Sequence, residues 1–250
     1  MPRFYVDLPI TLGANFELPD NVVRHMNVLR LRVGDLVVLF NGDGCDYTAV
    51  LTELTKRNAK VNIHKCDKLV NESHLKITLL PSLIASDKFD LVIQKAVELG
   101  VNEIIPVISQ YTQRLSNDKI SSRMEHWRKV IIAACEQSAR ATIPNLSEPT
   151  LFSDALLMVS AERKYVLSPH HERQQTLVGG AISSVAVLIG PEGGFSLKEV
   201  EEAQDNGFLT LQLSTRILRA ETAAICAVSL LQSYFGDFGL IKNNFNLLET

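Results

Sequence analysis

Cysteine and tryptophan are scarce in this chain of 250 residues, and its charges are nearly balanced. The cysteines stand far apart, without the paired spacing of a zinc site or a disulfide framework. They are Cys45, Cys66, Cys135 and Cys226. We therefore expect buried, reduced thiols and no bound metal. The 25 basic and 28 acidic residues give a net charge of −3, which excludes a globally basic nucleic-acid coat but allows a local basic face.

Long apolar runs are also missing. The longest stretches without a charge, residues 174–191 and 222–236, are interrupted by Ser, Gly or Gln. Neither matches a continuous membrane span of about 20 apolar residues. The first residues lack the apolar core and the small-residue cleavage site of a signal peptide. We expect no transmembrane helix and a cytoplasmic protein.

The composition that is present, 46% hydrophobic and 21% charged, is typical of a folded globular protein of one large or two ordinary domains. Residues 1–72 contain three β-branched runs joined by Asn-Gly and Asp-Gly turns, which predicts an antiparallel meander. A short helix is predicted to open at Pro19-Asp20-Asn21. Its apolar side would carry Val22, Val23, Met26 and Leu29. This segment is predicted to form a small β-barrel with a helix.

The periodicity changes in residues 73–250. Apolar runs of about five residues alternate with stretches of helical spacing. The runs read LKITLLP, EIIPVIS, KYVLSP, VAVLIGP and LTLQLS, and the clearest helices are predicted over 88–99, 121–139 and 221–234. Such alternation predicts an α/β domain with a parallel sheet and helices on its faces.

A glycine loop, Pro191-Glu192-Gly193-Gly194-Phe195, lies between a buried strand and a helix. Ser196 and Glu199 have the spacing of a capping box, which marks the start of that helix. Open α/β sheets bind ligands at such strand ends, where glycines let a ligand approach the backbone. A simple tight turn is an equally good interpretation. The loop has no P-loop lysine, which disfavours an NTPase.

A second strand-to-helix crossover follows at residues 215–220, between the strand LTLQLS and a helix that starts at Glu221, and the two loops could meet at one sheet edge. Arg219 and Glu221 flank its turn and could hold or polarise a planar, carbonyl-bearing base. Alternatively, Glu221 only stabilises the helix N-terminus. Glu136, Gln137 and Arg140 end an apolar helix, where they could face a site or solvent.

Four motifs occur together, in this order. They read QKAVELGV from residue 94, EQSAR from 136, IGPEGGF from 189 and RILRAETA from 216. The chain thereby resembles the small-subunit (16S) ribosomal RNA uridine N3-methyltransferase family, within the SPOUT superfamily. The resemblance spans the whole chain in order and spacing, including the PRF start and the RVGD strand.

The resemblance implies a fold that periodicity does not predict. Residues 1–72 would form a PUA-like RNA-binding β-barrel, and residues 73–250 a SPOUT methyltransferase domain whose parallel sheet contains a deep trefoil knot. General topology rules favour an unknotted sheet. The resemblance also implies a homodimer packed through the knotted region, and S-adenosyl-L-methionine bound in a bent shape by the knot loops. The cofactor positions that it implies are Leu167, Ser168, Pro169, Ile189, Gly190, Pro191, Glu192, Gly193, Gly194, Leu213, Ser214, Ile217, Leu218 and Arg219.

The implied reaction is metal-free methylation of N3 of one uridine, expected to be uridine 1498, in the 16S rRNA of the small ribosomal subunit. Because N3 must lose a proton, Glu221 is the candidate base, Arg219 the candidate charge stabiliser and Arg140 a further candidate. N3 lies on the Watson–Crick edge, so the target base must be unpaired or flipped out. The candidate phosphate contacts are Arg3, Arg24, His25, Arg30, Arg32, Lys88 and Lys95, each of which could equally be an ordinary surface charge.

Two other functions stay open at this stage. One is an RNA-binding module that has lost catalysis, and the other is phosphoryl transfer on a nucleotide that uses the glycine loop as an anion cradle. Adjacent His170 and His171 lack the spacing of a helical zinc pair, so a surface loop is the better interpretation. Phe89 and Trp127 are interpreted as core or dimer contacts rather than base-stacking platforms.

Overall fold

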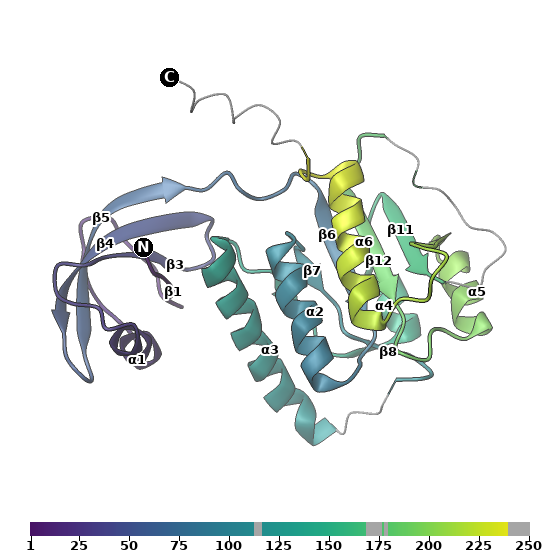
Figure 1. Ribbon diagram of the computed structural model, residues 1–250, viewed down its shortest axis with the longest axis horizontal. Coiled ribbons are helices and arrows are strands. Elements are labelled where there is room, and N and C mark those ends of the chain that lie inside the picture. The colour runs from purple at the N-terminus through teal and green to yellow at the C-terminus, as the bar shows by residue number, and fades with distance from the viewer. Residues whose placement is uncertain (113–116, 169–176, 178–179, 240–250) are drawn as a thin grey trace. The chain divides into compact units, whose positions relative to one another are not determined.

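The computed structural model describes residues 1–112, 117–168, 177 and 180–239. The chain divides into two compact units (Figure 1). The N-terminal unit consists of Met1–Glu72 and Ile132–Ile143, and the C-terminal unit of Ser73–Ile131 and Pro144–Thr250. Among the residues described, no helix is long and apolar enough to cross a membrane.

The N-terminal unit contains a five-stranded sheet with the order β1-β3-β4-β5-β2. Its strands are β1 (Arg3–Tyr5), β2 (Asn15–Glu17), β3 (Leu36–Phe40), β4 (Cys45–Leu54) and β5 (Ala59–Lys68). Strands β3, β4 and β5 form the predicted antiparallel meander, and β1 joins β3 in parallel. The sequence pattern did not predict β1 and β2, which have only three residues each.

Helix α1 (Asp20–Val28) packs one face onto this sheet. Val22, Val23 and Met26 are buried as predicted. Leu29 was expected on the same side but is 46% exposed. The helix ends at Val28 and Leu29 is its C-cap, so the helical spacing no longer applies there.

The end of helix α3 (Asn117–Ser138) and the residues after it belong to the N-terminal unit. The side chain of Arg140, a residue only 4% exposed, donates from Nε and Nη2 to the two carboxylate oxygens of Glu72, at 2.9 and 2.7 Å. Glu136 accepts the backbone N–H of Tyr5 at 3.0 Å. These polar contacts join residues 132–143 to the first 72 residues.

The C-terminal unit is built on a six-stranded parallel sheet with the order β13-β11-β12-β6-β7-β9. Its strands are β6 (Lys76–Pro81), β7 (Glu103–Ile104), β9 (Asn145–Leu146), β11 (Arg163–Leu167), β12 (Ser184–Ile189) and β13 (Leu209–Leu211). The predicted α/β class and parallel sheet are therefore confirmed. One predicted strand, EIIPVIS, is instead two. Pro106 separates β7 from β8 (Val107–Ile108), which pairs with β10 (Thr150–Leu151) in another sheet.

Helices cover both faces of this sheet. They are α2 (Ser86–Glu98), α4 (Phe152–Met158), α5 (Leu197–Asp205) and α6 (Ala220–Phe235), together with the first part of α3. Leu79 of β6 packs with residues of α2 and α6, which lie side by side, whereas its neighbour Leu80 packs with α4 and α5 (Figure 1). Successive residues of a strand point to opposite faces, which explains this division.

The predicted helices over 88–99, 121–139 and 221–234 correspond to α2, α3 and α6, but α3 begins four residues earlier than predicted. Helix α4 was not predicted. Phe89 and Trp127 are buried with their rings 4.8 Å apart, so their interpretation as core residues is confirmed.

All four cysteines are free, but the expectation that they are buried holds only for Cys135, since Cys45 is half-buried and the other two are exposed. Cys66 and Cys226 are exposed, because they lie on the solvent sides of β5 and α6. Cys135 is buried, and burial raises the pKa of its thiol to about 12. His170 and His171 lie outside the described residues.

The ion pair between Glu72 and Arg140 predicts a specific loss of stability. In Glu72→Gln, the buried guanidinium loses its carboxylate partner, so the free energy of unfolding should fall by about 1–3 kcal/mol. Urea unfolding followed by circular dichroism measures this change.

Glu136→Gln is the matched control, because burial raises the pKa of the Glu136 carboxyl. A raised folded-state pKa contributes stability below the unfolded value of about 4.3, and this contribution is lost as the pH rises through the folded pKa. A neutral glutamine should therefore leave stability at pH 7 unchanged or higher, with no gain in acid. An equal loss in both variants would contradict this assignment.

Candidate functional site

Three neighbouring strands of the parallel sheet end at the same edge. The order β13-β11-β12 places the segments after Leu167, Ile189 and Leu211 beside one another. The N–H of Ser168 donates to the carbonyl of Leu211 at 3.4 Å and links two of these strand ends. The carboxyl edge of a parallel sheet is where α/β proteins place their ligands. The two loops singled out in the sequence therefore do converge.

The glycine loop folds tightly on itself. The N–H of Gly194 donates to the carbonyl of Pro191 at 2.9 Å, and Gly194 has a φ of +70°, in the region that favours glycine. A Cβ on Gly190 would lie 3.2 Å from the Cα of Gly194. Side chains at these positions would disturb the turn, so the loop presents bare backbone at the strand end.

Glu199 holds Ser196, the residue that follows the glycine loop, by hydrogen bonds. It is only 8% exposed, and its Oε2 accepts the N–H and the hydroxyl of Ser196 at 2.8 and 2.9 Å. The N–H of Glu199 donates to Ser196 Oγ at 3.3 Å, which completes the predicted capping box at the start of α5. Oε1 accepts the N–H of Gln110 at 2.7 Å. One carboxylate thus joins the glycine loop to the turn after β8.

The crossover loop runs from Gln212 to the start of α6. The N–H of Arg216 donates to Ser214 Oγ at 3.1 Å, and the carbonyl of Arg219, the N-cap residue, accepts the N–H of Ala223 at 2.8 Å. The side chains of Arg216 and Arg219 are exposed. The loop therefore places two guanidinium groups at the same sheet edge as the glycine loop.

These loops enclose two adjoining hollows. The wide cavity measures about 800 Å³ and is lined by Lys88, Tyr111, Leu167, Ser168, Ile189, Gly190, Pro191, Glu192, Gly193, Gly194, Phe195, Ser196, Leu197, Val200, Ile217, Leu218, Arg219, Ala220 and Ala223. The narrow hollow measures about 80 Å³ and is lined by Leu167, Ser168, Leu211, Gln212, Leu213, Ser214, Arg216, Ile217, Leu218 and Ala223. Five residues line both, so the hollows are continuous.

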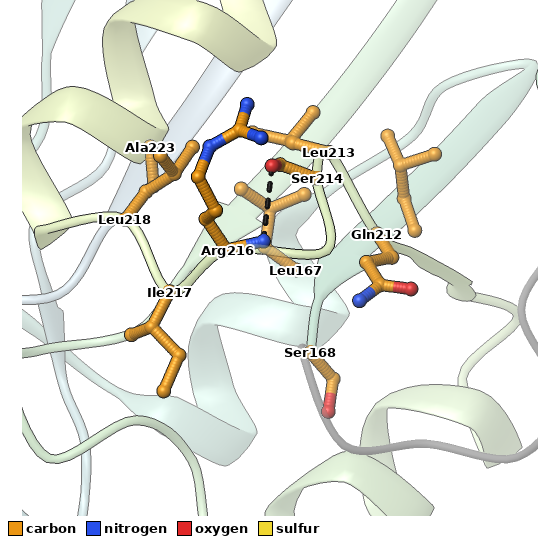
Figure 2. Close-up of a pocket in the computed structure, with 10 residues that line it drawn as sticks. Leu167, Ser168, Gln212, Leu213, Ser214, Arg216, Ile217, Leu218 and Ala223 are labelled. Carbon is orange, nitrogen blue, oxygen red and sulfur yellow. Dashed lines mark hydrogen bonds between the residues drawn. The ribbon is translucent and has the colours of Figure 1, made fainter.

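Figure 2 shows the narrow hollow between the end of β11 and the crossover loop. Leucine side chains from both segments line it, and the bond from Arg216 to Ser214 Oγ closes the loop beside them. Its lining is mainly apolar and includes one charged residue, Arg216, whereas Lys88, Glu192 and Arg219 bring charges of both signs to the wide cavity. The arrangement suits a ligand with an apolar, planar part and a charged part.

The structure brings the predicted cofactor residues together. Pro169 lies outside the described residues, and every other member of that set lines one of the two hollows. Binding of the cofactor by these residues stays a prediction. Among the residues described, no group of three or more His, Cys, Asp or Glu side chains could hold a metal ion.

The three candidate catalytic residues are placed differently. Arg219 lines the wide cavity. Glu221 lies in the first turn of α6, and its buried Oε2 has no hydrogen-bond partner within the described part of the chain. Arg140 belongs to the N-terminal unit, where its guanidinium binds Glu72. Neither Glu221 nor Arg140 lines either hollow.

The candidate RNA contacts also differ in exposure. Arg24, His25, Arg30 and Arg32 are exposed on the N-terminal unit. Lys88 and Lys95 of α2 are half-buried, and Lys95 is paired with Glu98. Arg3 differs from the other candidates because its guanidinium is not free at the surface. Its side chain is 10% exposed, paired with Asp46 and stacked over Phe40, so a phosphate would have to displace an existing partner.

The sequence reasoning missed several residues of the cavity wall. Tyr111 and Phe195 line the wide cavity, and Gln212 lines the narrow hollow. Phe195 is the last residue of the glycine loop, a signal that could have been used. Tyr111 lies beyond the split strand at Pro106, and no periodicity in the sequence indicated that it reaches this edge.

The sequence matches two families. A family described as an RNA methyltransferase domain matches residues 71–232, and one described as an RNA methyltransferase PUA domain matches residues 18–63. Ribosomal RNA small subunit methyltransferase E of Buchnera aphidicola (subsp. Schizaphis graminum) is 32% identical over 241 residues, covering 95% of this chain and 98% of that protein. The Bacillus subtilis protein of the same name is 28% identical and covers 92% and 95%.

Solved structures agree with these matches. The structure of ribosomal RNA small subunit methyltransferase E from Neisseria gonorrhoeae, bound to S-adenosyl methionine, has a TM-score of 0.89 at 38% identity and covers 95% of this chain and 99% of that one. A Legionella pneumophila protein with bound SAM has a TM-score of 0.89 at 36% identity, covering 94% and 98%. From its sequence, its fold and the loops at its sheet edge, the chain belongs to the ribosomal RNA small subunit methyltransferase E family.

Proposed function

We propose that this protein transfers the methyl group of S-adenosyl-L-methionine to N3 of one uridine, expected to be uridine 1498, of the 16S rRNA of the small ribosomal subunit. One observation carries the proposal. The glycine loop and the crossover loop, which hold the most specific motifs, enclose one cavity at the carboxyl edge of the parallel sheet. Two similar structures contain the same cofactor.

The residues at this edge fit S-adenosylmethionine. The glycine loop, whose tight turn leaves no room for a Cβ at Gly190 beside Gly194, offers bare backbone to the cofactor. The apolar narrow hollow, with Leu213 and Leu218, suits the flat adenine, and the polar wall of the wide cavity suits the ribose and the amino-acid part. We assign cofactor binding to the fourteen positions named from the sequence, Pro169 among them. Once bound, the cofactor supplies an electrophilic methyl group on sulfur.

The protein's own groups then act on the uracil. Glu221 takes the proton from N3, so that the N3 lone pair can form the new bond to carbon while the bond from carbon to sulfur breaks. Glu221 lines neither hollow in this structure, and its Oε2 is buried without a hydrogen-bond partner among the described residues, so the role of base rests on its position in the RILRAETA motif beside Arg219. Arg219, at the cavity wall, stabilises the negative charge that spreads to O2 and O4. No covalent enzyme intermediate is needed.

Arg140 is the further candidate for charge stabilisation. Its guanidinium already neutralises Glu72. We therefore assign the main role to Arg219, whose exposed guanidinium lines the cavity.

RNA binding is proposed for the PUA-like barrel of residues 1–72. The match to an RNA methyltransferase PUA domain supports this role, as do the exposed cations Arg24, His25, Arg30 and Arg32. Lys88 and Lys95 would extend the contact from residues 73–250. Arg3 is left out because of its partner Asp46.

We also propose the trefoil knot and the homodimer of this family for the present chain. The methyltransferase domain would be residues 73–250, in accord with the family match over 71–232. Ile217 and Leu197, at the cavity rim, are large apolar side chains that are 79% and 72% exposed, as expected for a face that a second copy covers.

The proposed function predicts a defined change in ribosomal RNA. In cells that lack the gene, mass-spectrometric mapping of methylated uridines should show the loss of one N3-methyluridine from 16S rRNA. Restoring the gene should restore the modification. An unchanged map would refute the assignment.

Arg219→Ala should lower turnover by about 10²-fold or more, because the developing negative charge on uracil loses its stabiliser. Methyl transfer to small ribosomal subunits measures this loss, and circular dichroism checks that the variant is folded. Arg128→Ala, an exposed arginine of α3 that lines neither hollow, is the matched control. Normal turnover in Arg219→Ala would remove Arg219 from the mechanism.

Glu221→Gln should lower turnover, and higher pH should partly restore it, because N3 then loses its proton to solvent without the base. The same methyl-transfer measurement over a pH series checks this. Normal turnover in this variant would remove Glu221 from the mechanism.

Arg32→Ala should weaken RNA binding and flatten the dependence of log affinity on log salt concentration by about one unit, because one phosphate contact is lost. Filter binding or anisotropy over a salt series measures the slope. Arg57→Ala, at another exposed arginine of the N-terminal unit, should leave the slope unchanged. Equal slopes for Arg32→Ala and wild type would exclude Arg32 from the RNA surface.

A further inference from the structure

Tyr111 is an exposed aromatic residue on the wall of the wide cavity. It is 54% exposed, although it packs directly against the glycine loop. A Cβ on Gly193 would lie 3.2 Å from the Cβ of Tyr111 and 3.5 Å from its Cγ. The absence of a side chain at Gly193 thus lets the tyrosine lie against the loop while much of its ring stays open.

The turn that carries Tyr111 is held at several points. Ser109 donates its N–H to Thr112 Oγ1 at 3.0 Å, and the two buried hydroxyls are 2.8 Å apart. Thr112 returns its N–H to the carbonyl of Ser109 at 3.1 Å. Gln110 is anchored by the buried carboxylate of Glu199. An exposed ring on such a fixed turn loses little conformational freedom when a ligand packs on it.

The surroundings of Tyr111 separate it from the hollow that suits adenine. It lines the wide cavity but is absent from the lining of the narrow hollow. Lys88 and Arg219, cations suited to a phosphate and to uracil oxygens, line the same wide cavity. An open ring that shares one cavity with two cations has the character of a subsite for a nucleotide that enters from solvent.

We propose that Tyr111 is the stacking platform for the target uracil, and that Lys88, which lines the same cavity, binds the adjoining phosphate. This inference rests on the proposed function, because it concerns the substrate of that site. A uracil removed from its RNA stack loses its neighbours, and the face of an aromatic side chain replaces one of them. Glu199 and Gln110 act as positioning residues, since they hold the turn and do not touch the base.

The test compares Tyr111→Leu and Tyr111→Phe with wild type in methyl transfer to small ribosomal subunits. Loss of the aromatic face in Tyr111→Leu should lower kcat/KM about tenfold or more, and Tyr111→Phe should restore it. Calorimetry with S-adenosylmethionine should give the same affinity for all three proteins. Tyr234→Leu is the matched control, because Tyr234 is 52% exposed and lines neither hollow.

Other outcomes overturn the inference. If Tyr111→Leu weakens S-adenosylmethionine binding in proportion to its loss of activity, the ring serves the cofactor instead. If Tyr111→Phe is as impaired as Tyr111→Leu, the hydroxyl and not the aromatic face is needed. An active wild type with an equally active Tyr111→Leu removes the platform and leaves the proposed function intact. A wild type that methylates no uridine refutes the proposed function itself.

Discussion

The parallel pairing of β11 with both β12 and β13 is the constraint on which the site depends. Because the three neighbouring strands run in the same direction, the chain leaves all of them at one edge of the sheet. The loops that follow the strands therefore lie next to one another. Each loop alone is an ordinary strand-to-helix connection. Their adjacency turns them into the two walls of one cavity, with bare glycine backbone on one wall and Arg219 on the other.

A single buried carboxylate makes this cavity wall rigid. Glu199 uses both oxygens, one for the cap of α5 and one for the backbone of Gln110, which is 89 residues away in sequence. Removing such an acceptor would leave several donors without partners. The glycine loop and the turn of Tyr111 are therefore positioned together, and the shape of the cavity follows from a hydrogen-bond network as much as from the sheet.

The sequence alone predicted those elements of the fold that a short-range residue pattern determines. The capping box at Ser196, the meander of residues 36–68 and the helices α2 and α6 all follow from short-range patterns. Prediction from the sequence failed where tertiary contacts determine the position of a residue. Pro106 splits a continuous apolar run between two sheets, Arg3 is paired with Asp46, and Tyr111 lies on a turn whose two ends, Ser109 and Thr112, are buried. The contact between Tyr111 and Gly193 joins residues far apart in the sequence, and no periodicity indicates it.

The contacts of residues 132–143 determine whether this protein can be divided into fragments that fold separately. Arg140 is bound to Glu72, and the carbonyl of Ala141 accepts the N–H of Gly44 at 3.2 Å. The N-terminal unit is thus assembled from two discontinuous pieces of the polypeptide. A fragment that stops at residue 72 would expose Glu72 and the Gly44 amide to water, so dissection by one cut cannot separate the two folding units intact.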